Sequence, residues 1–126
     1  MCIKGYGSPA LSKVEAGALF FEIAKRDFNT CGFLMIHNCL GIEVIDKLGS
    51  EELKARILPS SVNLEKIICF GLTEPGKGTD ASDLNTYATK VEGGYLLNGD
   101  KRWIGGAPIA DYLIIWAKNR YDDNRI

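Results

Sequence analysis

Residues 72–80 read LTEPGKGTD, and this loop-like stretch is the most distinctive segment of the 126-residue chain. It follows a short apolar run at 67–72 that reads as a β-strand. Two glycines inside it, Gly76 and Gly78, let a ligand approach the backbone closely, and its two threonines supply hydroxyl groups. Such a loop suits a flat heterocycle or a phosphate, although a connecting loop without a ligand has the same composition.

Residues 71–79 also fit the spelling of a phosphate-binding P-loop, Gly-x-x-x-x-Gly-Lys-Gly-Thr. A P-loop runs directly into a helix whose N-terminus faces the phosphates, whereas Asp80 and then strand-forming residues follow here. Glu74 would add a negative charge to the phosphate cradle, and Pro75 removes one backbone N–H from it. A P-loop nucleotide-binding protein therefore remains only as an alternative interpretation.

The first half of the sequence has helical periodicity. Ser12 followed three residues later by Glu15 is a capping-box pattern, and Ser50 can cap a further helix. The predicted helices span about residues 13–27, 30–48 and 51–58, with Gly49 as the C-cap of the second and Pro59 ending the third.

The second half is rich in strand-forming residues and turns. Strands are predicted at about 67–72, 86–91 and 110–116. A turn is expected at Gly93-Gly94, and a hairpin turn at Asn98-Gly99, because both of these residues tolerate a positive φ. The sequence thus predicts an α+β fold, a helical segment followed by the start of an antiparallel, barrel-like β-domain. Neither half closes a core well alone, so the chain reads as part of a larger fold.

Composition excludes several classes of function. Hydrophobic residues make up 46% and charged residues 25%, and 15 basic side chains nearly balance 16 acidic ones. This balance argues against a nucleic-acid partner, and the apolar runs read as too short for a membrane span. The four cysteines form no CxxC pair and His37 is the one histidine, so no metal site is expected. We expect His37 to be packed or half-exposed, with a place in a substrate channel as the alternative.

Two ordered motifs carry a family resemblance. The pattern Leu-Thr-Glu-Pro-x-x-Gly-(Ser/Thr)-Asp at 72–80, followed by Asn-Gly-x-Lys-x-Trp-Ile at 98–104, resembles the signatures of the acyl-CoA dehydrogenase superfamily. Residues 48–54 with Leu58-Pro59 resemble the helix before its central domain. Among its members, plant peroxisomal short-chain acyl-CoA oxidase and glutaryl-CoA dehydrogenase look most similar, and residues 4–7 and 102–105 favour the oxidase.

This resemblance covers nearly the whole chain and implies its domain organisation. Residues 1–65 would be the C-terminal part of the N-terminal helical domain, and residues 66–126 the first part of the middle β-domain. The C-terminal helical domain would be absent from the chain. The implied activity is a FAD-dependent oxidation of acyl-CoA that introduces an α,β double bond, in fatty-acid β-oxidation.

The resemblance also implies a cofactor site. Thr73 would meet the flavin through its backbone amide and hydroxyl, and Thr79 would touch both the flavin and the acyl-CoA substrate. Trp103 would pack on the flavin and exclude water, although an aromatic of a β-sheet core is the alternative. The implied FAD-binding residues are Phe70, Leu72, Thr73, Gly78, Thr79, Trp103, Ile104 and Gly105, and Thr79 is also the implied substrate-binding residue.

Gly105 departs from the common family pattern, which has a threonine whose hydroxyl bonds the reactive flavin nitrogen. Glycine cannot make this bond, and it leaves space beside the ring. We interpret this space as a route for oxygen, which an oxidase needs.

No catalytic residue is expected within the chain. The family's carboxylate base lies in the C-terminal helical domain, so the isolated chain is predicted to be inactive. Glu74 is expected to hold the loop rather than to catalyse, and Lys77 and Lys101 are expected to be solvated.

The resemblance further implies a homo-oligomeric complete enzyme and a peroxisomal location, with the mitochondrion as the alternative. A non-catalytic truncated relative that acts as an interaction module is the competing interpretation of function.

Overall fold

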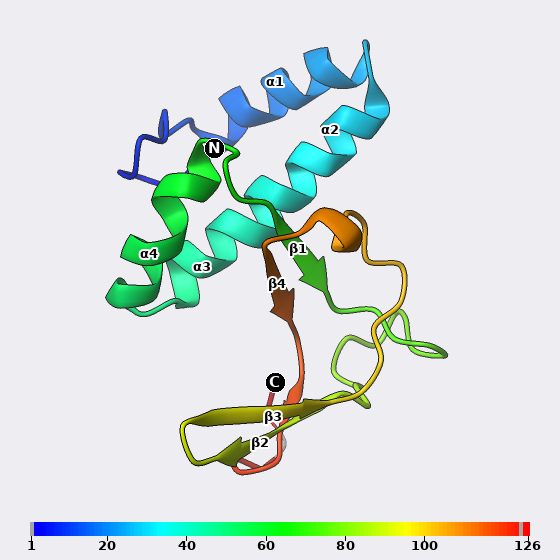
Figure 1. Ribbon diagram of the computed structural model, residues 1–126. Coiled ribbons are helices and arrows are strands. Elements are labelled where there is room, and N and C mark those ends of the chain that lie inside the picture. Colours follow the sequence, from blue (N-terminus) through cyan, green and yellow to red (C-terminus); the bar gives the residue numbers. More distant parts are fainter. Residues whose placement is uncertain (1, 124) are drawn as a thin grey trace. The chain divides into compact units, whose positions relative to one another are not determined.

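The computed structural model describes residues 2–123 and 125–126, and they fold into two compact units. The first unit contains residues up to Phe70 together with Gly105–Leu113, and the second contains Gly71–Ile104 and Ile114–Ile126. Helices dominate the first unit and strands the second (Figure 1). The predicted α+β class is therefore confirmed, with open sheets and no closed barrel among the described residues. Residues 66–70 and 105–113 belong to the helical unit, so each unit consists of two separate segments of the sequence.

Helices and strands occur in the predicted order along the chain. The helices are α1 (Lys13–Ala24), α2 (Phe28–Met35), the π-helical η1 (Ile36–Ile42), α3 (Glu43–Leu48), α4 (Glu51–Val62) and the 3₁₀ turn η2 (Ala107–Ile109). The strands are β1 (Ile68–Gly71), β2 (Tyr87–Val91), β3 (Gly94–Asn98), β4 (Tyr112–Ile115) and β5 (Lys118–Asn119). Strand β1 pairs with β4, and a three-stranded sheet has the order β3-β2-β5.

The capping box at the start of α1 is confirmed. The Ser12 hydroxyl accepts from the backbone N–H of Glu15, and the Glu15 carboxylate accepts from the backbone N–H of Ser12 at 2.8 Å. These two bonds satisfy donors that a helix start otherwise leaves without partners. Helix α1 then packs beside α2 in the first unit (Figure 1).

The second predicted helix starts earlier than expected and contains a π-helical segment. Asp27 is its N-cap, and its carboxylate accepts from the backbone N–H of Asn29 at 2.9 Å. The helix runs through η1, where the wider turn is a rare local geometry that is frequent at functional sites. It ends at Gly49, whose φ of −72° is not left-handed. A Cβ at Gly49 would lie 2.6 Å from the carbonyl oxygen of Ile45, so close packing accounts for this glycine.

The prediction that Pro59 ends the third helix is wrong. Pro59 lies inside α4, which continues to Val62. Leu58 and Ser61 are fully buried, and Val62 is nearly so, so the turn beyond the proline is held by packing in the core. Burial here outweighs the backbone bond that a proline removes.

The continuous helix Phe28–Leu48 is long and apolar enough, by length and composition, to cross a membrane. A core helix meets the same criterion, and this helix buries His37, Ile42 and Ile45 within the first unit. One third of its most apolar window is buried within the structure.

His37 lies at the centre of the first unit and is completely buried. Its Nδ1 accepts from the backbone N–H of Ile68 at 3.1 Å, so Nδ1 carries no proton. Its Nε2 lies 2.9 Å from the carbonyl oxygen of Ser61 and therefore donates to it. The expectation of a packed histidine is confirmed, and the ring joins η1, α4 and β1.

The turn expected at Gly93-Gly94 forms within one residue of that place and makes the hairpin, whereas the hairpin predicted at Asn98-Gly99 does not form. Strands β2 and β3 pair antiparallel with Val91 opposite Gly94, so Glu92 and Gly93 form the turn. Gly93 has a φ of +80°, which suits a tight hairpin. Gly99 also has a positive φ, but a Cβ there would lie 2.5 Å from the Thr86 hydroxyl oxygen. Asn98-Gly99 thus allows a close backbone approach and is not a hairpin turn.

Replacing His37 tests its role in joining these elements. His37→Ala leaves the N–H of Ile68 and the carbonyl of Ser61 without partners and opens a cavity, so the free energy of unfolding should fall by about 2–4 kcal/mol. Arg56→Ala, at an exposed position of the same unit, should change it by less than about 0.5 kcal/mol. Urea unfolding followed by circular dichroism measures both, and equal losses in the two variants would contradict this role.

Candidate cofactor site

A tight turn opens the loop at residues 72–80. The backbone N–H of Lys77 donates to the carbonyl of Glu74 at 3.1 Å, and Gly76 has a φ of +74°. Proline at the second position and glycine with positive φ at the third are the features of a type II turn. The Glu-Pro-Gly-Lys sequence therefore specifies this turn by local chemistry.

The Glu74 carboxylate is the structural centre of the second unit, with a side chain only 1% exposed. It accepts from the backbone N–H of Asn85 at 2.5 Å and of Thr86 at 2.9 Å. It also accepts from the Lys101 ammonium at 2.8 Å. This single side chain thus connects the loop, the start of β2 and the segment after β3.

Lys101 completes this network. Its side chain is 9% exposed, and its ammonium also donates to the carbonyl of Leu72 at 2.9 Å. The expectation that Lys101 is solvated is wrong, because a buried ammonium here has two oxygen acceptors. Lys77 is closer to that expectation, since it is partly exposed and pairs with the exposed Asp83.

The pKa of Glu74 lies far below its usual value. Burial by itself raises the pKa of this carboxyl, but the hydrogen bonds from Lys101, Thr86 and Asn85 outweigh burial and lower it to about 2. Glu74 is consequently ionised at neutral pH, and the donors around it occupy its oxygen atoms. This environment suits a carboxylate that holds a loop and does not suit a general base.

The two motif segments meet directly within the second unit. The backbone N–H of Arg102 donates to the carbonyl of Thr73 at 2.8 Å, next to the contact between Lys101 and Leu72. Trp103 follows with a left-handed φ of +61° and is 78% exposed. An exposed tryptophan on a strained backbone indicates a site where the surrounding structure imposes the conformation. The Arg102 guanidinium lies 4.3 Å from the centre of the indole ring.

The other expected site residues divide between the two units. Gly78 and Thr79 lie exposed in the loop of the second unit, and Leu72 and Ile104 are half-buried there. A Cβ at Gly78 would meet no atom within 4 Å, so the backbone is open at this point. Phe70 and Gly105 belong to the first unit, where Phe70 is half-buried and Gly105 exposed.

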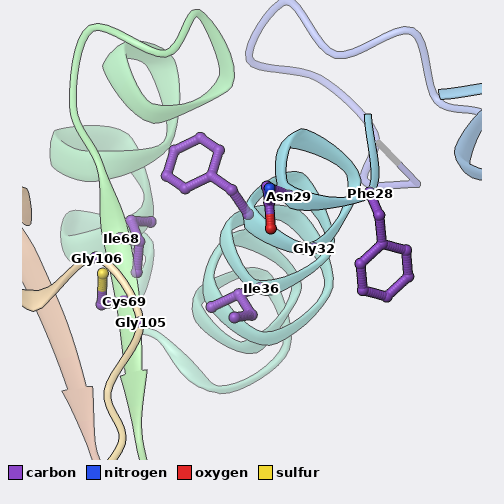
Figure 2. Close-up of a pocket in the computed structure, with 9 residues that line it drawn as sticks. Phe28, Asn29, Gly32, Ile36, Ile68, Cys69, Gly105 and Gly106 are labelled. Atoms are coloured by element: carbon purple, nitrogen blue, oxygen red, sulfur yellow. The ribbon is translucent and has the colours of Figure 1, made fainter. Parts of the chain in front are cut away.

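Gly105 lines an apolar pocket of about 280 Å³ in the first unit (Figure 2). Helix residues form one side of this pocket, and Ile68, Cys69 and Gly106 form the other. A Cβ at Gly105 would meet only the Ile36 side chain, at 3.6 Å, so there is room beside it. Burial raises the pKa of the Cys69 thiol, which keeps this wall uncharged.

No group of three or more potential metal ligands occurs in the part of the chain that the structure describes. The cysteines Cys2, Cys31, Cys39 and Cys69 are free thiols.

Comparison with known proteins decides the family. The model of the acyl-CoA dehydrogenase N-terminal domain matches residues 1–65, and the model of the middle domain matches residues 69–125. The chain belongs to the acyl-CoA dehydrogenase family. Members of this family are FAD-dependent oxidoreductases, and a solved structure similar to the chain is a glutaryl-CoA dehydrogenase in complex with FADH2.

Three similar proteins illustrate the family relationship. Mitochondrial isobutyryl-CoA dehydrogenase of Dictyostelium discoideum is 43% identical over 111 residues, 86% of this chain and 26% of that protein. The Bos taurus mitochondrial isobutyryl-CoA dehydrogenase is 35% identical over 89% of this chain and 27% of that protein. The glutaryl-CoA dehydrogenase of Mycobacterium smegmatis with FADH2 has a TM-score of 0.92 at 32% identity, covering 95% of this chain and 31% of that one. The chain thus spans about a quarter of the curated acyl-CoA dehydrogenases it matches.

Breaking the buried ion pair should be costly. Lys101→Met leaves the Glu74 carboxylate buried without its ammonium, so the free energy of unfolding should fall by about 3–5 kcal/mol. Lys77→Met removes a partly exposed ion pair of the same loop and should cost less than about 1 kcal/mol. Denaturant unfolding measures the free energy of unfolding of both variants. Similar decreases in the two would show that the buried pair stabilises the chain no more than the exposed pair does.

The depressed pKa of Glu74 predicts a pH dependence. Because the folded-state pKa of about 2 lies below the ordinary carboxyl pKa of 4.5, the stability that Glu74 contributes is fully present above pH 4.5. It is lost as the pH falls from 4.5 towards 2. The stability gap between the wild-type chain and Glu74→Gln should therefore shrink over this range. A gap that stays constant from pH 7 to pH 2.5 would rule out this assignment.

Proposed function

We propose that this chain supplies one wall of the flavin and acyl-CoA site of an acyl-CoA dehydrogenase. The observation that carries the proposal is the Glu74–Lys101 network, which brings the two family motifs together beside the exposed Trp103. The proposed FAD-binding residues are Phe70, Leu72, Thr73, Gly78, Thr79, Trp103, Ile104 and Gly105. Thr79 is also the proposed contact to the acyl-CoA thioester.

The chemistry of these residues fits a planar heterocycle. Trp103 offers an open aromatic surface, and the backbone at Gly78 has no neighbouring atom where a side chain would stand. Thr73 and Thr79 are exposed and carry hydroxyls that donate or accept hydrogen bonds. FAD, when bound, supplies a hydride acceptor for the β-hydrogen of the acyl group. The residues of this chain would bind and orient the ring and exclude water from one side of it.

We assign no catalytic base within this chain. The Glu74 carboxylate is ionised and fully engaged by backbone amides and Lys101, so it is not available to remove a proton from a substrate. The division at residues 65 and 66 between an N-terminal helical and a middle β-domain is part of the same proposal. The missing base would belong to a further helical domain of the complete protein.

We propose dehydrogenase rather than oxidase chemistry, because the similar proteins named above are dehydrogenases. The room beside Gly105 still leaves oxygen access as a testable alternative, since Gly105→Thr in a complete enzyme should slow reoxidation by oxygen if that route is used.

The mitochondrion is the proposed location, as both curated relatives named above are called mitochondrial and none of the three similar proteins supports a peroxisome. A homo-oligomer is proposed for the complete protein.

A non-catalytic interaction module is the second candidate. Strand β3 exposes Tyr95, Leu96 and Leu97, each more than half accessible, which is the kind of apolar surface that drives association.

The interpretation of residues 71–79 as a P-loop is not retained. The residues after Thr79 form turns and no helix, so no helix N-terminus faces the loop.

Titration of the purified chain with FAD tests the proposal. We expect flavin to bind, to quench tryptophan fluorescence and to remain with the protein during gel filtration. Trp103→Ala removes the stacking surface and should weaken binding by up to about tenfold. Trp116→Phe, at a half-buried position of the same unit, is the matched control and should bind FAD as the wild type does. A chain that stays colourless and unquenched would favour the interaction module.

A further inference from the structure

The pocket of the first unit is apolar and compact. Its volume of about 280 Å³ lies just below the usual range for small-molecule pockets, roughly 300–1,000 Å³. Phe33, Ile36 and Ile68 are among its lining residues, and Figure 2 shows helix and strand residues on its two sides. Among its lining residues none is lysine, arginine or histidine. A small uncharged group therefore fits this space, whereas a carboxylate entering it would lose its hydration without gaining a cation.

Gly32 lies between two apolar hollows of the first unit. It lines this pocket and also a second apolar hollow along the same helix, formed with Met35, Ile36, Cys39 and Leu40. A Cβ at Gly32 would meet no atom within 4 Å. Any larger side chain at this position would therefore extend into open space, which the two hollows supply, without a clash.

Residues of the pocket wall are neighbours in sequence of the proposed flavin contacts. Cys69 lies in the pocket wall immediately before Phe70 and the motif loop, and Gly105-Gly106 follow directly after Ile104. Both chain segments that carry proposed flavin contacts thus run through the pocket wall. The one polar side chain of the helix wall is Asn29, which is neutral.

We propose that Gly32 is a specificity-determining residue: its missing side chain keeps open an apolar pocket that admits a compact, uncharged acyl end and rejects one ending in a carboxylate. This inference rests on the proposed function and names the substrate class of that same site. It separates the chain from glutaryl-CoA dehydrogenase in substrate class, despite the strong structural similarity to it. The preferred substrate is a short or branched aliphatic acyl thioester.

Binding of two acyl-CoA thioesters to the full chain tests this inference. Isobutyryl-CoA is the uncharged probe and glutaryl-CoA the carboxylate probe, each titrated by calorimetry at pH 7. We expect isobutyryl-CoA to bind at least about tenfold more tightly, because burying an unpaired carboxylate is costly. Gly32→Leu should lower the affinity for isobutyryl-CoA by at least about tenfold, and Gly32→Ala should have a smaller effect.

Gly17→Leu is the matched control. Gly17 is also a helical glycine with no atom within 4 Å of an added Cβ, but it lies in α1 and outside the pocket. Both leucine variants replace glycine in a helix and should unfold at or above the wild-type temperature. A melting curve recorded for each variant therefore separates pocket filling from loss of structure.

The outcomes distinguish this inference from the proposed function. The inference would be overturned if glutaryl-CoA bound as tightly as isobutyryl-CoA or more tightly, or if neither thioester bound. It would also be overturned if Gly32→Leu left the affinity for isobutyryl-CoA unchanged, or if Gly17→Leu lowered that affinity equally. FAD binding, measured on the same preparations, reports separately on the proposed function. A chain that binds isobutyryl-CoA selectively without FAD would support the pocket assignment and contradict the flavin site.

Discussion

The ion pair between Glu74 and Lys101 is the interaction on which the second unit depends. Two segments that are 27 positions apart in sequence meet through this pair, and the backbone bond from Arg102 to Thr73 lies beside it. A buried charge pair is tolerated only when its remaining donors and acceptors are satisfied. Here the amides of Asn85 and Thr86 and the carbonyl of Leu72 satisfy them. The exposed Trp103 follows in a conformation that the backbone would not adopt freely.

Local chemistry explains which parts of the fold the sequence could predict. The capping box at Ser12 and the turn at residues 74–77 depend on residues a few positions apart, so their patterns are readable directly. Pro59 and Asn98-Gly99 differ from what their local patterns predict, because tertiary packing determines the structure at both places. Burial of Leu58 and Ser61 carries α4 past its proline, and the contact with Thr86 explains Gly99 better than a hairpin does.

The sequence predicts which segments form the candidate site, but it does not predict which contacts hold these segments in place. The two signature segments indicate a flavin wall, yet nothing in their spacing shows that Lys101 is buried or that Glu74 holds three donors. Those facts depend on long-range contacts between the loop and the segment after β3. His37 is similar, since a lone histidine on an apolar helix face does not reveal that Ile68 and Ser61 use both ring nitrogens. The structure thus supplies the supporting contacts that the motifs leave unspecified.

Amide hydrogen exchange with and without FAD tests most directly whether the buried pair builds one flavin wall from two segments. The account predicts that residues 71–80 and 101–104 gain protection together when FAD is added to the wild-type chain. It also predicts that Lys101→Met, studied where it remains folded, loses this gain in both segments at once. Protection confined to one segment, or a gain that survives in Lys101→Met, would contradict the account.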